Sequence, residues 1–164
     1  MRILAGLSAT TTLLLTGAVA GVFFAYSVSV MMGLDAIGPE QAIAAMRGIN
    51  DKIQNALFLT AFLLSPVAAA VTGVLLLVLG QRTAGVVFLL AGAVYVLGAL
   101  VPSFAVNIPM NDALDAARPS AGEAARVWAD YSSRWTAWNH LRTVSSLFSM
   151  VLAGLGMFVW GRQA

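Results

Sequence analysis

The sequence predicts an all-α fold, a four-helix transmembrane bundle whose second and fourth helices extend beyond the bilayer on one face. Two observations predict it. Hydrophobic residues make up 60% of the 164 residues, and only 10% are Asp, Glu, Lys or Arg. These few charges are absent from four stretches, residues 3–33, 53–80, 83–111 and 143–161. Because about 20 apolar residues in a helix cross the hydrocarbon core of a bilayer, each stretch is long enough to span it.

We expect one domain, residues 1–164, with spans at about 3–32, 53–79, 84–105 and 143–161. Four helices and their connections leave no room for a separate soluble domain at this length. The first span begins like a secretory signal, with an A-x-A motif at residues 18–20. Its apolar sequence continues without interruption to Met32, which favours an uncleaved and tilted first helix.

Proline and glycine mark the course of the second helix. Pro39 suits a first helical turn, so we expect this helix to begin in water beside it and to enter the membrane further along. Pro66 lies inside the apolar run and should kink the helix. The turn at residues 80–85 is short, which makes spans two and three antiparallel neighbours.

The third and fourth spans have equally clear boundaries in the sequence. Span three should end near Pro102, because residues 106–111 are too rich in Pro and Asn for a helix interior. Ser120 and Glu123 fit a capping box, in which each side chain bonds the other's free backbone N–H. We therefore expect the last helix to be one long rod, wet in its first half and embedded in its second.

The charges also bear on sidedness. Arg2, Arg82 and Arg162, with no acid, flank one side of the predicted bundle, and the two long loops hold the other six cations and all seven acids. Counting Lys and Arg alone would place the long loops inside, but the last of these loops is long and its arginines are candidates for a site. We expect both termini in the cytoplasm and the protein in the plasma (inner) membrane.

Aromatic side chains recur along the predicted last helix at spacings of three, four and three: Trp128, Tyr131, Trp135 and Trp138. They share one helical face. An interfacial belt that anchors the helix at headgroup level is one interpretation. The other is that some of these rings wall a pocket for a flat hydrophobic ligand.

Two stripes of small residues recur every four positions: Gly17, Gly21 and Ala25 in the first span, and Ser145, Ser149 and Ala153 in the last. Such spacing allows helix backbones to approach closely in a membrane. We expect lipids as partners, and a homo-oligomer held through such helix faces is a further expectation.

The polar side chains that could carry chemistry gather at one predicted membrane face, because the helix directions bring the ends of three spans together. His140, the only histidine, suits proton transfer near neutral pH. Arg142 could hold an anionic oxygen or extend to a lipid phosphate. The plain alternative for the asparagines is that they cap helix ends. The catalytic candidates are His140, Arg142, Asn139 and Asn107, and the substrate-binding candidates are Asn50, Asn111, Trp135, Trp138 and Tyr26.

Several classes of chemistry find no support. The chain has no cysteine, so disulfides and thiolate metal sites are absent, and we predict no metal site. Nine cations spread over several loops do not make a nucleic-acid footprint. No cofactor is predicted, although haem bound through His140 stays open.

Four segments carry a resemblance to a known family: residues 20–32, 42–50, 106–111 (Val-Asn-Ile-Pro-Met-Asn) and 135–143 (Trp-Thr-Ala-Trp-Asn-His-Leu-Arg-Thr). Together they resemble the anthrone oxygenase-like family of integral membrane proteins. Gly33 departs from the pattern, which has a proline after the methionine pair. The resemblance implies an oxidoreductase, since some members are associated with the oxidation of anthrones to anthraquinones.

Two hypotheses from different classes follow. In the first, the protein is an oxygenase for a lipophilic phenol or anthrone, in which His140 removes a proton, an amide or Arg142 stabilises the enolate oxygen, and O2 reacts without a cofactor. In the second, it is a non-catalytic lipid-binding or assembly subunit. Transport is weaker, because no acidic residue lies within a span to relay protons or bind cations.

Overall fold

The computed structural model describes residues 1–163, and the side chains of residues 1–162. The described chain is helical and contains no strand: α1 (Arg2–Ala25), η1 (Tyr26–Val30), α2 (Met31–Asp35), α3 (Pro39–Ile53), α4 (Ala56–Val78), α5 (Arg82–Tyr95), η2 (Val96–Leu100), η3 (Ser103–Asn107), α6 (Ile108–Ala116) and α7 (Ala121–Gln163). The three η segments are π-helical turns inside longer helices. The all-α prediction is confirmed.

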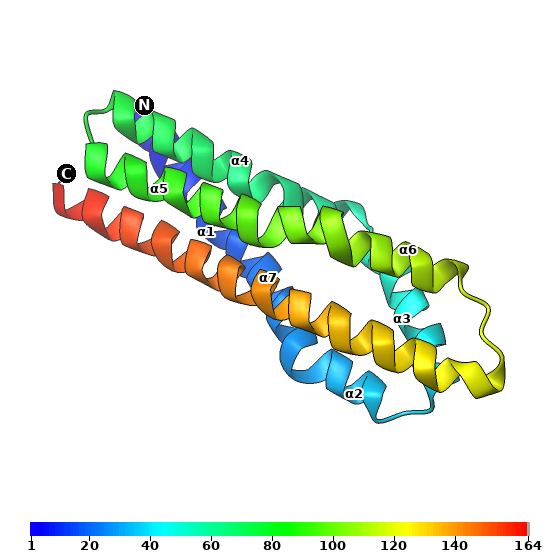
Figure 1. Cartoon of the computed structure of the whole chain (residues 1–164). Helices are drawn as coiled ribbons and strands as arrows, with labels where there is room; N and C mark the ends of the chain where they lie inside the picture. The colour runs from blue at the N-terminus through cyan, green and yellow to red at the C-terminus, as the bar shows by residue number, and fades with distance from the viewer. Residues whose placement is uncertain (164) are drawn as a thin grey trace.

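Four helical rods cross the length of the molecule (Figure 1). Each is long and apolar enough to span a membrane: Arg2–Asp35, Ala56–Val78, Arg82–Ala116 and Ala121–Arg162. The two termini and the α4–α5 turn lie at one end, and α2, α3, α6 and the start of α7 lie at the other (Figure 1). The protein is therefore an integral membrane four-helix bundle. The α3 helix and the first half of α7 lie at the end opposite the termini, as predicted, and α2 and α6 lie beside them.

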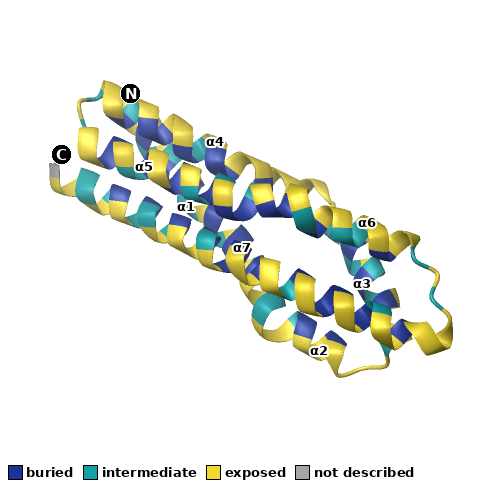
Figure 2. Ribbon diagram, in the orientation of Figure 1, coloured by how far each residue is buried: buried dark blue, intermediate teal, exposed yellow. Residues whose placement is uncertain are grey.

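Apolar side chains cover the outside of the crossing helices. Leu14, Val74 and Phe148 are each more than half exposed within the isolated chain, and exposed residues run along the outer faces of all four rods (Figure 2). In water such a surface would be costly, whereas lipid tails are as apolar as these side chains. The distribution fits a chain surrounded by lipid.

The predicted turn between spans two and three is a compact helix cap. Gly80 has φ of +78°, which a glycine adopts without a steric penalty. Its N–H bonds the carbonyl of Leu77 at 3.0 Å, and the N–H of Gln81 bonds that of Leu76 at 2.9 Å. These two bonds form a Schellman motif, which ends α4 and reverses the chain into α5.

The backbones of α4 and α5 touch where two glycines face each other. A Cβ on Gly73 would lie 3.0 Å from the carbonyl oxygen of Gly85, and one on Gly85 would lie 2.9 Å from that of Gly73. Spans two and three are thus antiparallel neighbours, as the short turn predicted.

The two predicted small-residue stripes differ in outcome. Ser145 lies where a Cβ on Gly98 would be, and Ser149 donates to the carbonyl of Ala91 at 2.8 Å, so the second stripe packs α7 on the third rod. Gly17 faces Met150, but Gly21 has nothing within 4 Å of its Cβ position among the described residues. An oligomer through that first stripe stays a prediction.

Two predicted boundaries are wrong. Helix two is not continuous, because α3 ends at Ile53 and α4 begins at Ala56, with Asn55 capping α4 through a bond from the N–H of Phe58 at 3.0 Å. The helix of span three does not end near Pro102, since it continues through residues 106–111 to Ala116.

The π turns explain how the third rod passes its prolines. Pro102 and Pro109 each lie two residues after the end of a π turn, η2 and η3 respectively. A proline has no N–H and its ring crowds the carbonyl four residues earlier. A wider turn just before it accommodates both defects, so the helix continues where the sequence predicted a break.

In α4 the helix continues through Pro66 by a different means. Proline leaves the carbonyl of Phe62, four residues earlier, without its helical donor. The hydroxyl of Tyr95 on α5 donates to that oxygen at 3.0 Å. A tyrosine on the neighbouring helix therefore replaces the lost bond.

Candidate functional site

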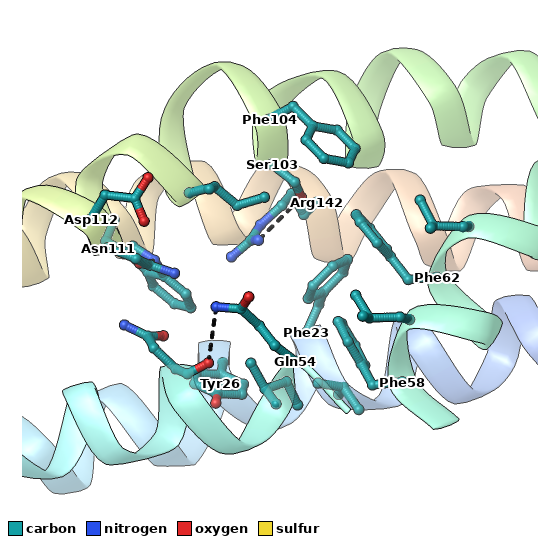
Figure 3. Close-up of a pocket in the computed structure, with 17 residues that line it drawn as sticks. Phe23, Tyr26, Gln54, Phe58, Phe62, Ser103, Phe104, Asn111, Asp112 and Arg142 are labelled. Carbon is teal, nitrogen blue, oxygen red and sulfur yellow. Dashed lines mark hydrogen bonds between the residues drawn. The ribbon is translucent and has the colours of Figure 1, made fainter. Parts of the chain in front are cut away.

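A cavity of about 300 Å³ lies where α3 meets α4, facing α1, the third rod and α7 (Figure 3). Seventeen residues line it: Val22, Phe23, Tyr26, Asn50, Ile53, Gln54, Phe58, Leu59, Phe62, Leu63, Ser103, Phe104, Ile108, Asn111, Asp112, Trp135 and Arg142. This size is at the lower limit of typical small-molecule sites. Two of the three π turns, η1 and η3, begin at its wall, and such turns are frequent at functional sites.

One side of the cavity is aromatic and apolar. Phe58 stacks on Phe62 with ring centroids 5.6 Å apart, and Phe23 meets Phe62 edge-on at 6.2 Å. The ring of Phe104, on the third rod, lies with its centroid 6.2 Å from that of Phe62. The opposite side carries Gln54, Asn111 and Asp112, and Arg142 lies between the two sides (Figure 3). The cavity is thus amphipathic.

Arg142 is the only cation among the lining residues, and it is 6% exposed. Its guanidinium lies between the rings of Phe23 and Trp135, at 4.5 and 4.8 Å from their centroids. Nη1 donates to Ser103 at 3.2 Å and Nη2 to Asn139 at 2.8 Å. Its side chain is held from four directions and does not extend to the headgroups.

No carboxylate within the described residues lies within 4 Å of the Arg142 guanidinium, and its Nε has no hydrogen-bond partner there. A buried charge without a counterion costs several kcal/mol of desolvation. Aromatic faces offset part of that cost. The part of the desolvation cost that remains favours binding of an anionic oxygen in the cavity, because this oxygen would supply a counter-charge.

Asn139 sets the position of this arginine. Its Nδ2 donates to the carbonyl of Phe23 and to Ser27, both at 2.9 Å, so both N–H groups are used. Its Oδ1 is then the acceptor that faces Arg142. Asn139 is fully buried and does not line the cavity, so it acts on the site by positioning the arginine.

Asn111 is oriented by two aromatic donors. The hydroxyl of Tyr131 and the Nε1 of Trp135 both donate to its Oδ1, each at 2.9 Å. Its amide N–H groups therefore face the other way, toward the cavity (Figure 3). Across from it, the buried Nδ2 of Asn50 has no partner among the described residues. Unpaired buried donors favour a ligand with oxygen acceptors.

His140 lies outside the cavity. It is exposed on the surface of α7, and its Nδ1 is 3.0 Å from the hydroxyl of Ser27. Ser27 in turn bonds Thr143 at 2.9 Å. The histidine therefore joins a chain of hydroxyls between α7 and η1. It lies two residues from Arg142 on the same helix, and this spacing places the two side chains on different faces.

Of the nine predicted site residues, five line the cavity: Tyr26, Asn50, Asn111, Trp135 and Arg142. Four do not: Asn107, Trp138, Asn139 and His140. Asn107 is buried and donates to the carbonyl of Trp135 at 3.2 Å, and Trp138 is 39% exposed. Asp112, Gln54 and the phenylalanines were missed. For Phe104, Ile108 and Asp112, the available signal was their spacing of four residues, which places them on one helix face.

The aromatic face of α7 is mostly interior. Trp128, Tyr131 and Trp135 are each at most 6% exposed, so an interfacial belt is wrong for these three. Trp128 and Ser132 both donate to the carboxylate of Asp35, at 2.9 and 2.7 Å, and so fix the end of α2 against α7. Trp135 lines the cavity, and Trp138 alone of the four is exposed.

Within residues 1–163, no three His, Cys, Asp or Glu side chains are grouped so as to hold a metal ion. His140 could offer its Nε2 to a haem only from the outer surface of α7, because its Nδ1 faces Ser27.

Fold and cavity together define a polytopic membrane protein with an amphipathic chamber at one end of its bundle. The family model described as anthrone oxygenase matches residues 55–152, more than half of the chain, and the protein belongs to that family. No curated protein and no solved structure shows a significant match. The matched region includes Asn111, Asp112, Trp135 and Arg142, and family membership indicates a membrane oxygenase-type function.

Proposed function

We propose that this protein oxidises a lipophilic anthrone or phenol with O2 in the cavity around Arg142. The observation that carries the proposal is a buried guanidinium without a carboxylate partner, set between two aromatic rings. A flat ring system with one anionic oxygen matches both features, since its rings can stack on Trp135 and its oxygen can bind the cation.

The reaction begins with removal of a proton from the ring carbon opposite the substrate carbonyl. The sequence favoured His140 as the base, but Asp112 is the only carboxylate among the lining residues, and we assign it this role. The electron pair moves to the carbonyl oxygen, which becomes an enolate. Arg142 and the amide of Asn111 hold this oxyanion, because donors aimed at developing charge lower the barrier most.

The enolate then reacts with O2. One electron passes from the enolate to O2, which leaves a substrate radical and superoxide. These two radicals combine and form a C–O bond. The resulting peroxide anion takes back the proton held by Asp112. Loss of water breaks the O–O bond, and the remaining hydrogen on that carbon leaves as a proton. Anthrone and O2 thus give anthraquinone and water, so O2 is the only oxidant. We propose that no cofactor takes part.

The test is O2 uptake by the purified protein with anthrone in detergent or vesicles. We expect Arg142→Met to lower turnover about 100-fold. Arg142→Lys keeps the charge but loses the planar stack on Phe23 and Trp135. Its turnover should therefore lie between that of the unmodified protein and that of Arg142→Met. Equal turnover in all three would remove Arg142 from the mechanism.

An absorption spectrum separates the alternatives. A Soret band in the active protein would replace direct reaction with O2 by haem chemistry. A colourless protein that co-purifies with lipid and never consumes O2 with anthrones or phenols would instead favour the lipid-binding subunit.

We also propose that both termini face the cytoplasm of the plasma membrane. The chain has no cysteine, so single cysteines can report sidedness. A membrane-impermeant maleimide added to intact cells should label Ala121→Cys, at the start of α7, and leave Arg82→Cys, at the start of α5, unlabelled. The reverse pattern would invert the orientation.

A further inference from the structure

The mouth of the cavity is defined by residues that line it and are also exposed. The apolar ones are Leu59 and Leu63 on α4 and Phe104 and Ile108 on the third rod, with exposed fractions between 38% and 57%. Gln54 and Asp112 also line the cavity and are exposed. A side chain that faces both the cavity and the outside lies at an opening. The mouth is therefore a slit between α4 and the η3–α6 segment.

The two edges of this slit are regular rows. Leu59 and Leu63 are four residues apart on α4, and Phe104, Ile108 and Asp112 are four apart on the facing helix. Positions four apart share a helix face. Phe104 and Asp112 lie on the helix opposite the one that carries Phe58 and Phe62 (Figure 3). The slit thus runs along the helices.

Both ends of the slit are fixed. At the loop end, Arg47 on α3 donates to the carbonyl of Leu114 at 2.7 Å and to that of Ala117 at 2.7 Å, which ties α3 to the end of α6. Toward the bilayer centre, Tyr95 bonds the carbonyl of Phe62. No such bond crosses the slit between these two ties among the described residues, so no hydrogen bond holds its edges together there.

The slit changes polarity along its length. Leu63 and Phe104 form its membrane edge, while Gln54 and Asp112 form the edge nearer the loops. A molecule dissolved in the bilayer, with an apolar ring system and one polar edge, lies in a membrane with that edge toward the headgroups. The same orientation brings its polar edge toward Arg142, so it need not turn or cross water.

We propose that the slit is a lateral portal through which a bilayer-dissolved, flat aromatic ketone reaches Arg142, with Phe104 and Leu63 as its gate. The identity of this molecule rests on the proposed function, but the route does not. The portal selects molecules that partition into lipid and are thin enough to pass between the Leu63 and Phe104 side chains.

The test closes the slit with paired substitutions. Leu63→Trp with Phe104→Trp fills the gate. The matched control is Leu64→Trp with Ala105→Trp, which adds the same two side chains one position along each helix, at exposed residues that do not line the cavity. The probe is anthraquinone, which needs no turnover, delivered from phosphatidylcholine vesicles, and its association is followed by quenching of tryptophan fluorescence.

We expect the closed variant to bind the probe about tenfold more slowly than the control, because gating by side chains acts on the rate of access. Phe104→Ala should bind it faster than the unmodified protein. Closed and control variants that bind at the same rate would overturn the portal, and so would an unmodified protein that does not bind the probe.

Failure of the portal and failure of the oxygenase remain distinct. If anthrone is oxidised but closure slows neither binding nor turnover, the portal alone is wrong. If anthrone is never oxidised while closure slows probe binding, the route holds and the oxygenase is wrong.

Discussion

The two halves of the bundle are held together in different ways. In the half that contains the termini, the backbones of α4 and α5 touch at Gly73 and Gly85, and the hydroxyl of Thr72 donates to Ser8 at 2.8 Å. In the other half, π turns widen the helices, and buried atoms of Asn50 and Arg142 lack partners in the described chain. One half is packed for stability, and the other is left open at a cost in stability.

The proposed oxygenase site lies in the half that packs less well. Neutral unpartnered groups also occur in the packed half, at Ser146 and Trp160. Among the described residues, the one buried charge without an ion-pair partner, Arg142, lies in the cavity half. Sites that bind or react commonly reduce stability in this way, because their polar groups are arranged for a ligand.

The largest expected effect lies in the packed half. Gly85→Leu forces a side chain against the backbone oxygen of Gly73, and we expect it to lower the free energy of unfolding by about 3 kcal/mol. Titration with denaturing detergent measures the loss. Gly21→Leu is the matched control, since no described atom lies within 4 Å of its Cβ position. Equal losses would mean that the helix contact is not the cause.

The comparison predicts the opposite behaviour for the cavity. Arg142→Met should lower turnover about 100-fold but leave the free energy of unfolding unchanged or raised by up to about 1 kcal/mol, because it removes a buried charge that has no counterion. Parallel titrations of the two proteins check this. A clear loss of stability would show that the stacking on Phe23 and Trp135 outweighs the desolvation cost.

Tyr95 lies at the boundary between the halves and offers a smaller, cleaner effect. Tyr95→Phe leaves the carbonyl of Phe62 without a donor and should cost about 1–2 kcal/mol. In a Pro66→Ala background the helix regains its own donor, so the same substitution should cost much less. A double-mutant cycle measures the difference. Additive losses would mean that the tyrosine does not compensate for the proline.

Sequence could predict the packed half far better than the cavity half. Hydrocarbon excludes charge, so four uncharged runs were enough to define the spans, and Gly80 with its short turn fixed the α4–α5 pairing. The course of α6 was missed because Pro102 and Pro109 usually end helices, and π turns leave no simple pattern in a sequence. Arg142 was found as a candidate, but its lack of a counterion depends on three-dimensional distances.

His140 tests the contrast with the smallest expected effect. Chemistry alone favours the only histidine as a base, whereas geometry places it outside the cavity, bonded to Ser27. We expect His140→Ala to keep turnover within about twofold, since general-base catalysis contributes about 10²–10⁴-fold and its loss would be unmistakable. Asp112→Asn should lose about 100-fold under the same conditions. If the two results were exchanged, the reacting carbon would have to lie beside His140 on the outer face of α7. The cavity around Arg142 would then be a binding site for the uncharged part of the substrate.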